Sequence, residues 1–197
     1  MSLILASSSP YRQDLLTRLG LAFVAIAPDV DETPLPGEAP GALAQRLAIA
    51  KARRISVRHP GAVVIGSDQV AAMGSQFLGK PGTAERARAQ LHRLSGQTVI
   101  FHTALCVTNG KEDETATVLT ECRFRRLCED EIHQYLKREQ PYDTAGSAKA
   151  EGLGIALMEH VRSDDPTAII GLPLITLCTM LRNFGRDPVL DGVEHLR

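Results

Sequence analysis

The sequence contains no tryptophan, and aromatic residues make up only 4 % of its 197 residues. This scarcity argues against a stacking platform for single-stranded nucleic acid, which depends on aromatic faces. Neither sign of charge dominates, because 22 Lys and Arg residues stand against 23 Asp and Glu residues. A balanced chain has no overall field to attract a nucleic-acid backbone or an anionic membrane. We therefore expect no polymeric nucleic-acid or membrane partner, and any phosphate binding must be local.

Cysteine and histidine patterns that hold metals are also missing. The four cysteines show no C-x-x-C spacing, and the six histidines include no H-x-x-x-H pair. A zinc site and a disulfide framework are therefore not expected. No apolar run approaches the roughly 20 residues of a membrane span, and no secretory hydrophobic segment precedes the first predicted strand. We expect a soluble cytoplasmic protein with free thiols.

The hydrophobic pattern predicts alternating strands and helices. The segment 62–68 begins with an unbroken apolar run, which is typical of a strand buried on both faces in a parallel or mixed sheet. Periodicity and turn residues predict strands at 3–6, 21–26, 62–68, 97–108 and 115–127, and helices at 11–19, 39–58, 83–95, 129–138 and 173–184. The two long strands at 97–108 and 115–127 form a hairpin that is expected to lie at a sheet edge. This order of elements predicts an α/β domain with two lobes and a deep cleft.

A serine-rich segment follows the first predicted strand. Ser7, Ser8 and Ser9 lead into Pro10, and Arg12 comes two residues later. Serine caps a helix and proline suits its first position, so the first helical N–H groups stay available. These groups, the helix dipole and Arg12 all favour a bound phosphate. The alternative is an ordinary Ser/Pro helix cap.

Lys51 lies inside an apolar stripe. Leu43, Leu47 and Ile55 recur at steps of four residues along the helix predicted at 39–58, and Lys51 occupies the missing step. Its stem can lie over the core with the ammonium in water. The other interpretation is an ammonium that points into a cleft.

Two acidic positions suit a metal or a reacting water. Asp68 ends the buried strand, where open α/β sheets bind their ligands, although aspartate also ends strands as an ordinary turn residue. Glu32 belongs to an acidic loop with Asp29 and Asp31, and such runs are often simply solvated. Together, Glu32 and Asp68 would offer the oxygen ligands that Mg²⁺ or Mn²⁺ prefers.

Lys80 follows Gly79 and precedes Pro81, which places a lysine on a stiff loop. The spacing of a Walker P-loop is absent, and residues 66–68 do not form a G-x-S-x-G motif. Two carboxylates, two lysines, one arginine and a serine-rich helix start are the parts that clamp a polyphosphate and activate water. Hydrolysis of a phosphoanhydride depends mostly on positioning and charge neutralisation.

The motifs as a set resemble those of the Maf (septum-formation-inhibitor-like) nucleoside triphosphate pyrophosphatases, from Leu3 to about Pro188. The matching segments are Ala6-Ser7-Ser8-Ser9-Pro10 with Arg12, Asp31-Glu32-Thr33-Pro34, Lys51-Ala52, Gly66-Ser67-Asp68-Gln69-Val70, Gly79-Lys80-Pro81, Ala145-Gly146-Ser147 and Gly171-Leu172-Pro173-Leu174. The resemblance implies an elongated two-lobed α/β fold with a mixed sheet, flanking helices and a central cleft over residues 1–190. Residues 191–197 would form a loose tail. It also implies a divalent metal, Mg²⁺ or Mn²⁺, and cleavage between the α- and β-phosphates to give a nucleoside monophosphate and pyrophosphate.

The resemblance also assigns roles to individual residues. Asp68 and Glu32 would be catalytic carboxylates and metal ligands, and Lys51 and Lys80 would hold phosphates in the catalytic set. Substrate binding would fall to Ser7, Ser8 and Arg12. Asp68 can hardly bind a metal and accept a proton at full strength, so these two roles are alternatives.

Three positions, Tyr11, Gln69 and Glu151, point to a subgroup. Relatives of the dTTP/UTP type have threonine where this chain has Gln69 and tend to have glutamine where it has Glu151. This chain resembles the branch that acts on 7-methyl-GTP, although those relatives carry tryptophan at the Tyr11 position. The positive charge of N7-methylguanine favours an aromatic face and a carboxylate, and Glu151 can accept hydrogen bonds from the guanine N–H groups. Without the resemblance, Tyr11 would be a core aromatic residue and Glu151 a surface charge.

We therefore expect an enzyme that hydrolyses 7-methyl-GTP to 7-methyl-GMP and pyrophosphate, and so removes modified nucleotides. The alternatives are a dTTP/UTP pyrophosphatase of the same family and a non-catalytic nucleotide-binding regulator of cell division. A homodimer is predicted through the unpaired edge of the hairpin.

Overall fold

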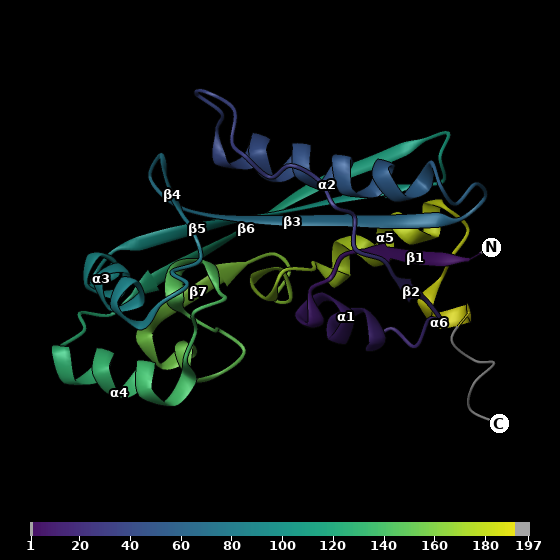
Figure 1. Ribbon diagram of the computed structural model, residues 1–197. Helices are drawn as coiled ribbons and strands as arrows, with labels where there is room; N and C mark the ends of the chain where they lie inside the picture. Colours follow the sequence, from purple (N-terminus) through teal and green to yellow (C-terminus); the bar gives the residue numbers. More distant parts are fainter. Residues whose placement is uncertain (1, 192–197) are drawn as a thin grey trace. The chain divides into compact units, whose positions relative to one another are not determined.

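The computed structural model describes residues 2–191 (Figure 1). Within this range the chain divides into two compact units. Unit 1 contains residues 2–69, 103–118 and 165–191, and unit 2 contains residues 70–102 and 119–164. The chain passes from one unit to the other inside three long strands and once in a loop.

The elements follow the alternating order that the sequence predicts. In chain order they are β1 Leu3–Ala6, α1 Pro10–Thr17, β2 Val24–Ala25, α2 Pro40–Ser56, β3 Val63–Met73, β4 Gln76–Leu78, α3 Ala84–Leu94, β5 Thr98–Thr108, β6 Asp113–Phe124, α4 Glu129–Glu139, the short 3₁₀ turns η1 Ala145–Ser147 and η2 Leu153–Leu157, β7 Met158–Ser163, η3 Ala168–Ile170, α5 Leu174–Asn183 and α6 Pro188–Asp191. The sheet order is β2-β1-β3-β5-β6-β7, and β4 pairs with β3. Because β1 runs parallel to β3 while β7 runs antiparallel to β6, the sheet is mixed. The predicted α/β class with a mixed sheet and flanking helices is confirmed.

β7 was not expected from the sequence. β7 pairs with β6 between Thr120 and Phe124, so the hairpin is not a sheet edge along that stretch, and this prediction is wrong there. The six residues of β7 alternate too weakly between polar and apolar to signal a strand. The predicted homodimer therefore cannot form through the part of the hairpin edge that β7 covers. Of the predicted loose tail, Asp191 ends α6 and the remainder lies outside the described residues.

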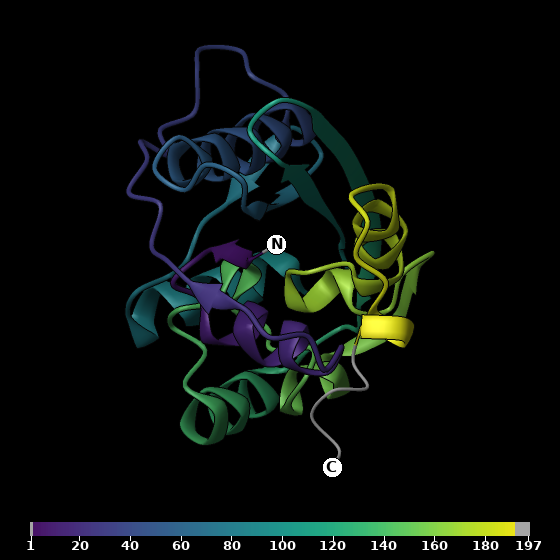
Figure 2. The same cartoon turned by 90° about the vertical axis from the view of Figure 1, so that its right-hand side faces the viewer.

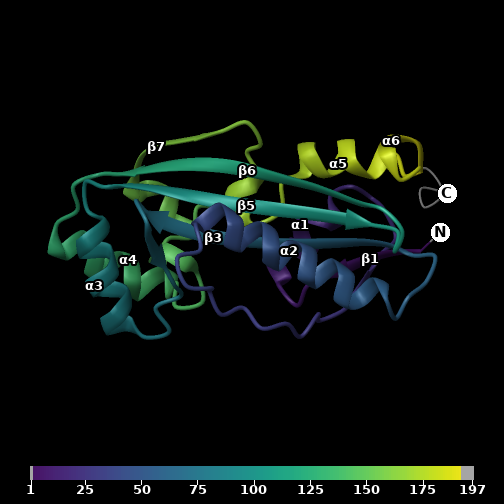
Figure 3. The ribbon, with the colours of Figure 1, turned by 90° about the horizontal axis from the view of Figure 1, so that it is seen from above.

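The layers of unit 1 follow from the alternation of side chains along β1 and β3. Leu5 and Ile65 face a core that α1 and α5 complete. Gly66 faces α2 instead, and a Cβ atom there would lie 2.7 Å from the backbone nitrogen of Ala52 and closer still to the Ala48 carbonyl oxygen. Figures 2 and 3 show α2 covering the face of β1 and β3 that is opposite to α1. Only glycine at 66 permits this close approach.

Unit 2 is built around α3 and α4, which pack against each other. η1 packs on α3 and η2 packs on α4, so the glycine-bearing stretch between them is held by both helices. Leu91, Leu94, Ile132 and Tyr135 are among the buried side chains of this unit. Across residues 2–191, no helix combines the length and apolar character needed to cross a membrane.

Candidate active site

The serine-rich turn forms the helix cap that its sequence predicts. Ser9 is the N-cap of α1, and its Oγ accepts a hydrogen bond from the Arg12 backbone nitrogen at 3.4 Å. Pro10 occupies the first helical position. The buried Ser7 accepts a hydrogen bond at Oγ from the Ser9 backbone nitrogen at 3.1 Å, while Ser8 is exposed. The role of Ser7 and Ser8 in phosphate binding stays a prediction.

Lys51 is the centre of a charged cluster in unit 1. Its side chain is only 7 % exposed, within the stripe of α2 that packs on the sheet. Its Nζ lies 2.6 Å from Asp68 Oδ1 and 2.5 Å from Glu32 Oε1. The ammonium therefore meets two carboxylates rather than water. Asp68 reaches it because it points to the same side of β3 as Gly66, where α2 approaches most closely.

Asp68 is the more buried carboxylate, with 10 % of its side chain exposed. Burial raises the pKa of Asp68, since a charged carboxylate is poorly solvated there. The neighbouring Lys51 and Arg12 oppose this rise in pKa, and Glu32 adds to it. A carboxylate with a raised pKa is a stronger base than an exposed one, and this property suits a group that takes a proton from water.

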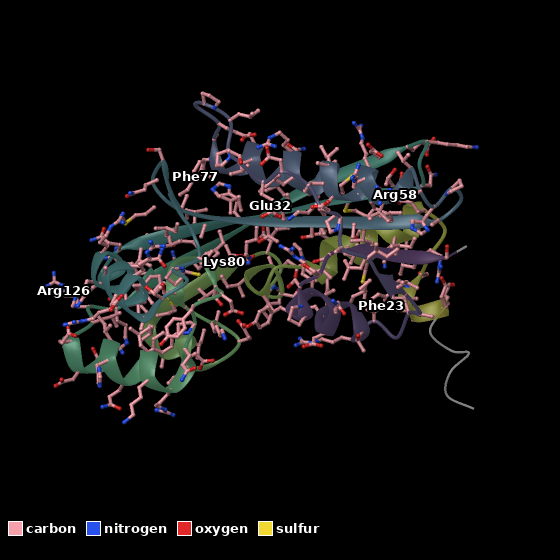
Figure 4. The ribbon with its side chains drawn as sticks, in the orientation of Figure 1. Phe23, Glu32, Arg58, Phe77, Lys80 and Arg126 are labelled. Carbon is pink, nitrogen blue, oxygen red and sulfur yellow. The ribbon has the colours of Figure 1, made fainter. Side chains whose placement is uncertain are left out.

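Glu32 differs from Asp68 in its exposure. Its side chain is 60 % exposed, and it projects from the loop between β2 and α2 (Figure 4). Within residues 2–191, no group of three or more His, Cys, Asp or Glu side chains is arranged to hold a metal. Glu32 and Asp68 nevertheless converge on one cation, the Lys51 ammonium. Since Mg²⁺ commonly takes one or two protein carboxylates plus substrate phosphates, this donor pair fits a divalent metal that arrives with a nucleotide.

Arg12 is fixed by the backbone carbonyl of Gly171, a group to which the sequence assigns no role. Its Nε donates to the Gly171 oxygen at 2.8 Å, and the Ser67 hydroxyl donates to the same oxygen at 3.0 Å. Burial lowers the pKa of Arg12, while the charges of Asp68 and then Glu32 oppose that change. The Gly171 backbone has φ +117°, a conformation that favours glycine. The motif at 171–174 marks this segment in the sequence, but a carbonyl acceptor has no signature in residue type.

Gln69 follows Asp68 directly but faces the opposite side of β3. Its Nε2 donates to Thr103 Oγ1 at 3.0 Å and to the carbonyl oxygens of Ala168 and Ile169 at 2.9 and 3.1 Å. This amide group therefore holds the backbone of η3. The predicted role of Gln69 in substrate specificity stays a prediction. The half-buried Tyr11 lies in the first turn of α1.

Glu151 is exposed in unit 2, yet the backbone on both sides of it is fixed. The Lys149 backbone nitrogen donates to the Tyr135 hydroxyl at 3.1 Å, and the Leu153 nitrogen donates to Glu139 Oε2 at 2.9 Å. Tyr135 and Glu139 both come from α4. Hydrogen bonds to α4 therefore fix the backbone on both sides of the exposed Glu151 side chain.

Lys80 is also exposed in unit 2, and Figure 4 labels it. The preceding Gly79 carbonyl accepts a hydrogen bond from Gln90 Nε2 at 3.2 Å, and the buried Ser147 hydroxyl donates to Gln90 Oε1. A chain of hydrogen bonds therefore links η1 through α3 to the Lys80 loop. The 145–147 motif signalled Ser147 in the sequence, while nothing there singled out Gln90.

The structure thus brings four of the predicted residues together in unit 1, namely Arg12, Glu32, Lys51 and Asp68. Lys80 and Glu151 belong to unit 2. All four cysteines are free, as expected, with Cys106 and Cys122 buried.

Comparison with known proteins places this set of residues in a family. A family model described as Maf-like protein matches residues 2–184. The chain is 64 % identical over 187 residues to a protein of Bordetella pertussis (strain Tohama I) named 7-methyl-GTP pyrophosphatase, covering 95 % of this chain and 94 % of that protein. Proteins with the same name from Nitrosococcus oceani and Polaromonas sp. (strain JS666) are 56 % identical over 191 residues and 55 % identical over 196 residues. These matches cover 96 % and 98 % of this chain, and 96 % and 89 % of the two relatives. The chain therefore belongs to the Maf family.

Proposed function

We propose that this protein hydrolyses 7-methyl-GTP to 7-methyl-GMP and pyrophosphate, and so removes a modified nucleotide. The observation that carries the proposal is the buried Lys51 ammonium held between Asp68 and Glu32, in a chain whose relatives bear the name 7-methyl-GTP pyrophosphatase. A nucleoside triphosphate is the substrate class that needs such a balanced set of carboxylates and cations.

Asp68 is the group that accepts the proton of the attacking water. Burial and the raised pKa support this role over that of principal metal ligand. As the water oxygen bonds to the α-phosphorus, the bond to the bridging oxygen breaks and pyrophosphate leaves. Lys51 keeps Asp68 oriented, and Arg12, held by the Gly171 carbonyl, faces the negative charge that develops on the phosphates.

Glu32 would hold Mg²⁺ or Mn²⁺ together with the substrate phosphates, which leaves Asp68 to accept the proton. A metal held there would neutralise charge on the phosphates. The exposure of Glu32 suits this role, because Mg²⁺ retains several waters and needs room for them. Ser7, Ser8 and Lys80 contribute further phosphate contacts in this proposal.

The first test is pyrophosphate release by purified protein with Mg²⁺ or Mn²⁺ on 7-methyl-GTP, GTP, UTP, dTTP and CTP. The proposal expects strong preference for 7-methyl-GTP. Preference for UTP or dTTP would support the proposed hydrolysis but refute 7-methyl-GTP as the substrate. Saturable binding without any product would favour a regulator. The Asp68→Asn variant should lose about 10²- to 10⁴-fold in kcat while melting cooperatively, and full activity in this variant would refute its role.

Base recognition has its own test in Glu151→Gln. The positive N7-methylguanine would lose a favourable charge, so kcat/KM for 7-methyl-GTP should fall much more than kcat/KM for UTP. Glu85→Gln, at another exposed glutamate of unit 2, is the matched control and should change neither value. Equal losses on both nucleotides would remove Glu151 from the specificity set.

A further inference from the structure

The segment between β2 and α2 carries Glu32 but contains neither helix nor strand. Ile26 makes a backbone hydrogen bond to the Leu5 carbonyl oxygen at 2.9 Å, and α2 begins only at Pro40. A stretch of this length without regular structure samples many conformations unless side chains hold it. The position of the Glu32 carboxylate therefore depends on what fixes this loop.

Arg46 and Glu38 bind the backbone immediately after Glu32. Arg46 Nε and Nη2 donate to the two Glu38 carboxylate oxygens at 2.7 and 2.8 Å, which is the bidentate geometry of a strong pair. Arg46 Nη2 also donates to the Thr33 carbonyl oxygen at 3.0 Å. Glu38 Oε2 accepts from the Leu35 backbone nitrogen at 2.9 Å. The pair thus bonds the loop backbone at Thr33 and at Leu35.

Arg46 and Lys51 come from the same helix, α2. The Glu32 loop is therefore attached to one rigid element at two points, through its backbone at Arg46 and through its carboxylate at Lys51. The Glu32 side chain is 60 % exposed, and an ion pair with one exposed partner is by itself a weak restraint. The Glu38 side chain is only 8 % exposed, so the clamp is better shielded than the carboxylate it supports.

We propose that Arg46, together with Glu38, is a positioning residue that fixes Glu32 for the reaction by clamping the loop backbone to α2. This inference rests on the proposed function for its effect on catalysis. Arg46 acts through Glu32 and has no contact with the reacting atoms in this role. Its removal should therefore matter only while Glu32 has its carboxylate.

The decisive experiment is a double-mutant cycle with Arg46→Met and Glu32→Gln. Arg46→Met alone should lower kcat by about 10- to 100-fold, with a much smaller change in nucleotide KM, because the catalytic geometry loosens. In the Glu32→Gln background the same substitution should change kcat little, since there is no carboxylate left to position. Multiplicative losses in the two backgrounds would overturn the proposal. Arg46→Lys keeps the charge without the bidentate fork and should recover only part of the activity.

A second measurement does not depend on turnover. Hydrogen exchange of the nucleotide-free protein should show faster exchange in the peptide covering residues 27–39 in Arg46→Met than in wild type. The control is Arg54→Met, an exposed arginine on the same helix, which should leave exchange and kcat unchanged. Unchanged exchange of residues 27–39 in Arg46→Met would overturn the clamp.

The two measurements separate the failure of this inference from that of the proposed function. A wild-type protein without nucleotide turnover would refute the proposed function, and loop exchange would still decide whether Arg46 clamps the loop. Should Arg46→Met fail to fold, Glu38→Gln replaces it, because it weakens the same pair while preserving side-chain size. Glu38→Gln should produce the same pattern at smaller magnitude, and its absence would overturn the inference.

Discussion

The two units hold their candidate site residues in different ways. In unit 1, Lys51 and Asp68 are buried and contact each other directly, so each depends on the charge of the other. In unit 2, Lys80 and Glu151 are exposed, and hydrogen bonds fix the backbone beside them rather than the charged groups. Substitutions in unit 1 should therefore change stability and activity together, whereas substitutions in unit 2 should separate them.

The largest expected effect is that of Gly66→Ala. A Cβ at this position would collide with the backbone of α2, and helix backbone cannot move aside as a flexible side chain can. We expect a loss of about 3 kcal/mol or more in the free energy of unfolding, with loss of activity, measured by urea denaturation. Gly79→Ala in unit 2 is the control, because nothing lies within 4 Å of its Cβ position. Similar stabilities of the two variants would contradict the close packing of α2.

Lys51→Met should have the next largest effect. It leaves the buried Asp68 without its nearest cation, and removing one partner of a buried pair costs roughly 3 kcal/mol. The loss should depend on pH, because the pKa of Asp68 rises further in the folded state. The folded protein then binds more protons than the unfolded chain, so stability falls as pH rises above the ordinary aspartate pKa of about 3.9. Unfolding titrations from acid to neutral pH should show the variant's deficit growing, and a constant deficit would contradict this account.

Lys80→Met tests the contrast between unit 1 and unit 2, since it removes a lysine from the same proposed catalytic set as Lys51. Because Lys80 is exposed, the free energy of unfolding should change by no more than about 0.5 kcal/mol. Pyrophosphate release should nevertheless fall by about 10-fold or more through the lost phosphate contact. Thermal unfolding and kinetics on the same preparation test both statements. A destabilised Lys80→Met protein would show that the contrast between the units is wrong.

The smallest expected effect is on the stability of the folded protein at acidic pH. Hydrogen bonds from Arg46 and then from the Leu35 backbone lower the pKa of Glu38 to about 2. Because the pKa of Glu38 is lowered in the folded state, its carboxylate stabilises that state at pH values above the ordinary glutamate pKa. This contribution is lost as the pH falls toward 2. The difference in melting temperature between wild type and Arg46→Met should therefore shrink from pH 5 to pH 2. A difference that stays constant over that range would contradict the pKa assignment.

Much of the fold followed from periodic patterns, and the failures have identifiable causes. The stripe of Leu43, Leu47 and Ile55 predicted α2 and marked Lys51 as unusual, because burial repeats with the helix period. The segment 62–68 predicted a buried strand, but the prediction that this strand ends at Asp68 is wrong, because β3 continues to Met73. It also did not predict which face each residue takes, since a strand buried on both sides shows no alternation. The pattern therefore gives no sign that Asp68 and Gln69 point to opposite faces of β3.

The supporting groups were the hardest part of the site to predict. Gly171 contributes a carbonyl oxygen, and Gln90 contributes an amide from the middle of a helix. Neither role can be predicted from the residue type. β7 alternates too weakly to signal a strand, and the short turns around Glu151 lack the length that makes a periodic signal readable. Residue type identified the charged groups, whereas tertiary packing decides what orients them.

The balance of charge around Lys51 affects how strongly the cluster attracts a nucleotide. Two carboxylates are offset by two cationic side chains in unit 1, so this cluster presents almost no surplus of positive charge. A bare triphosphate approaching it would gain little from attraction and would repel both carboxylates. Nucleotide that carries its own counterion avoids that repulsion, so the cluster should select for the charge state of the substrate as well as for its base.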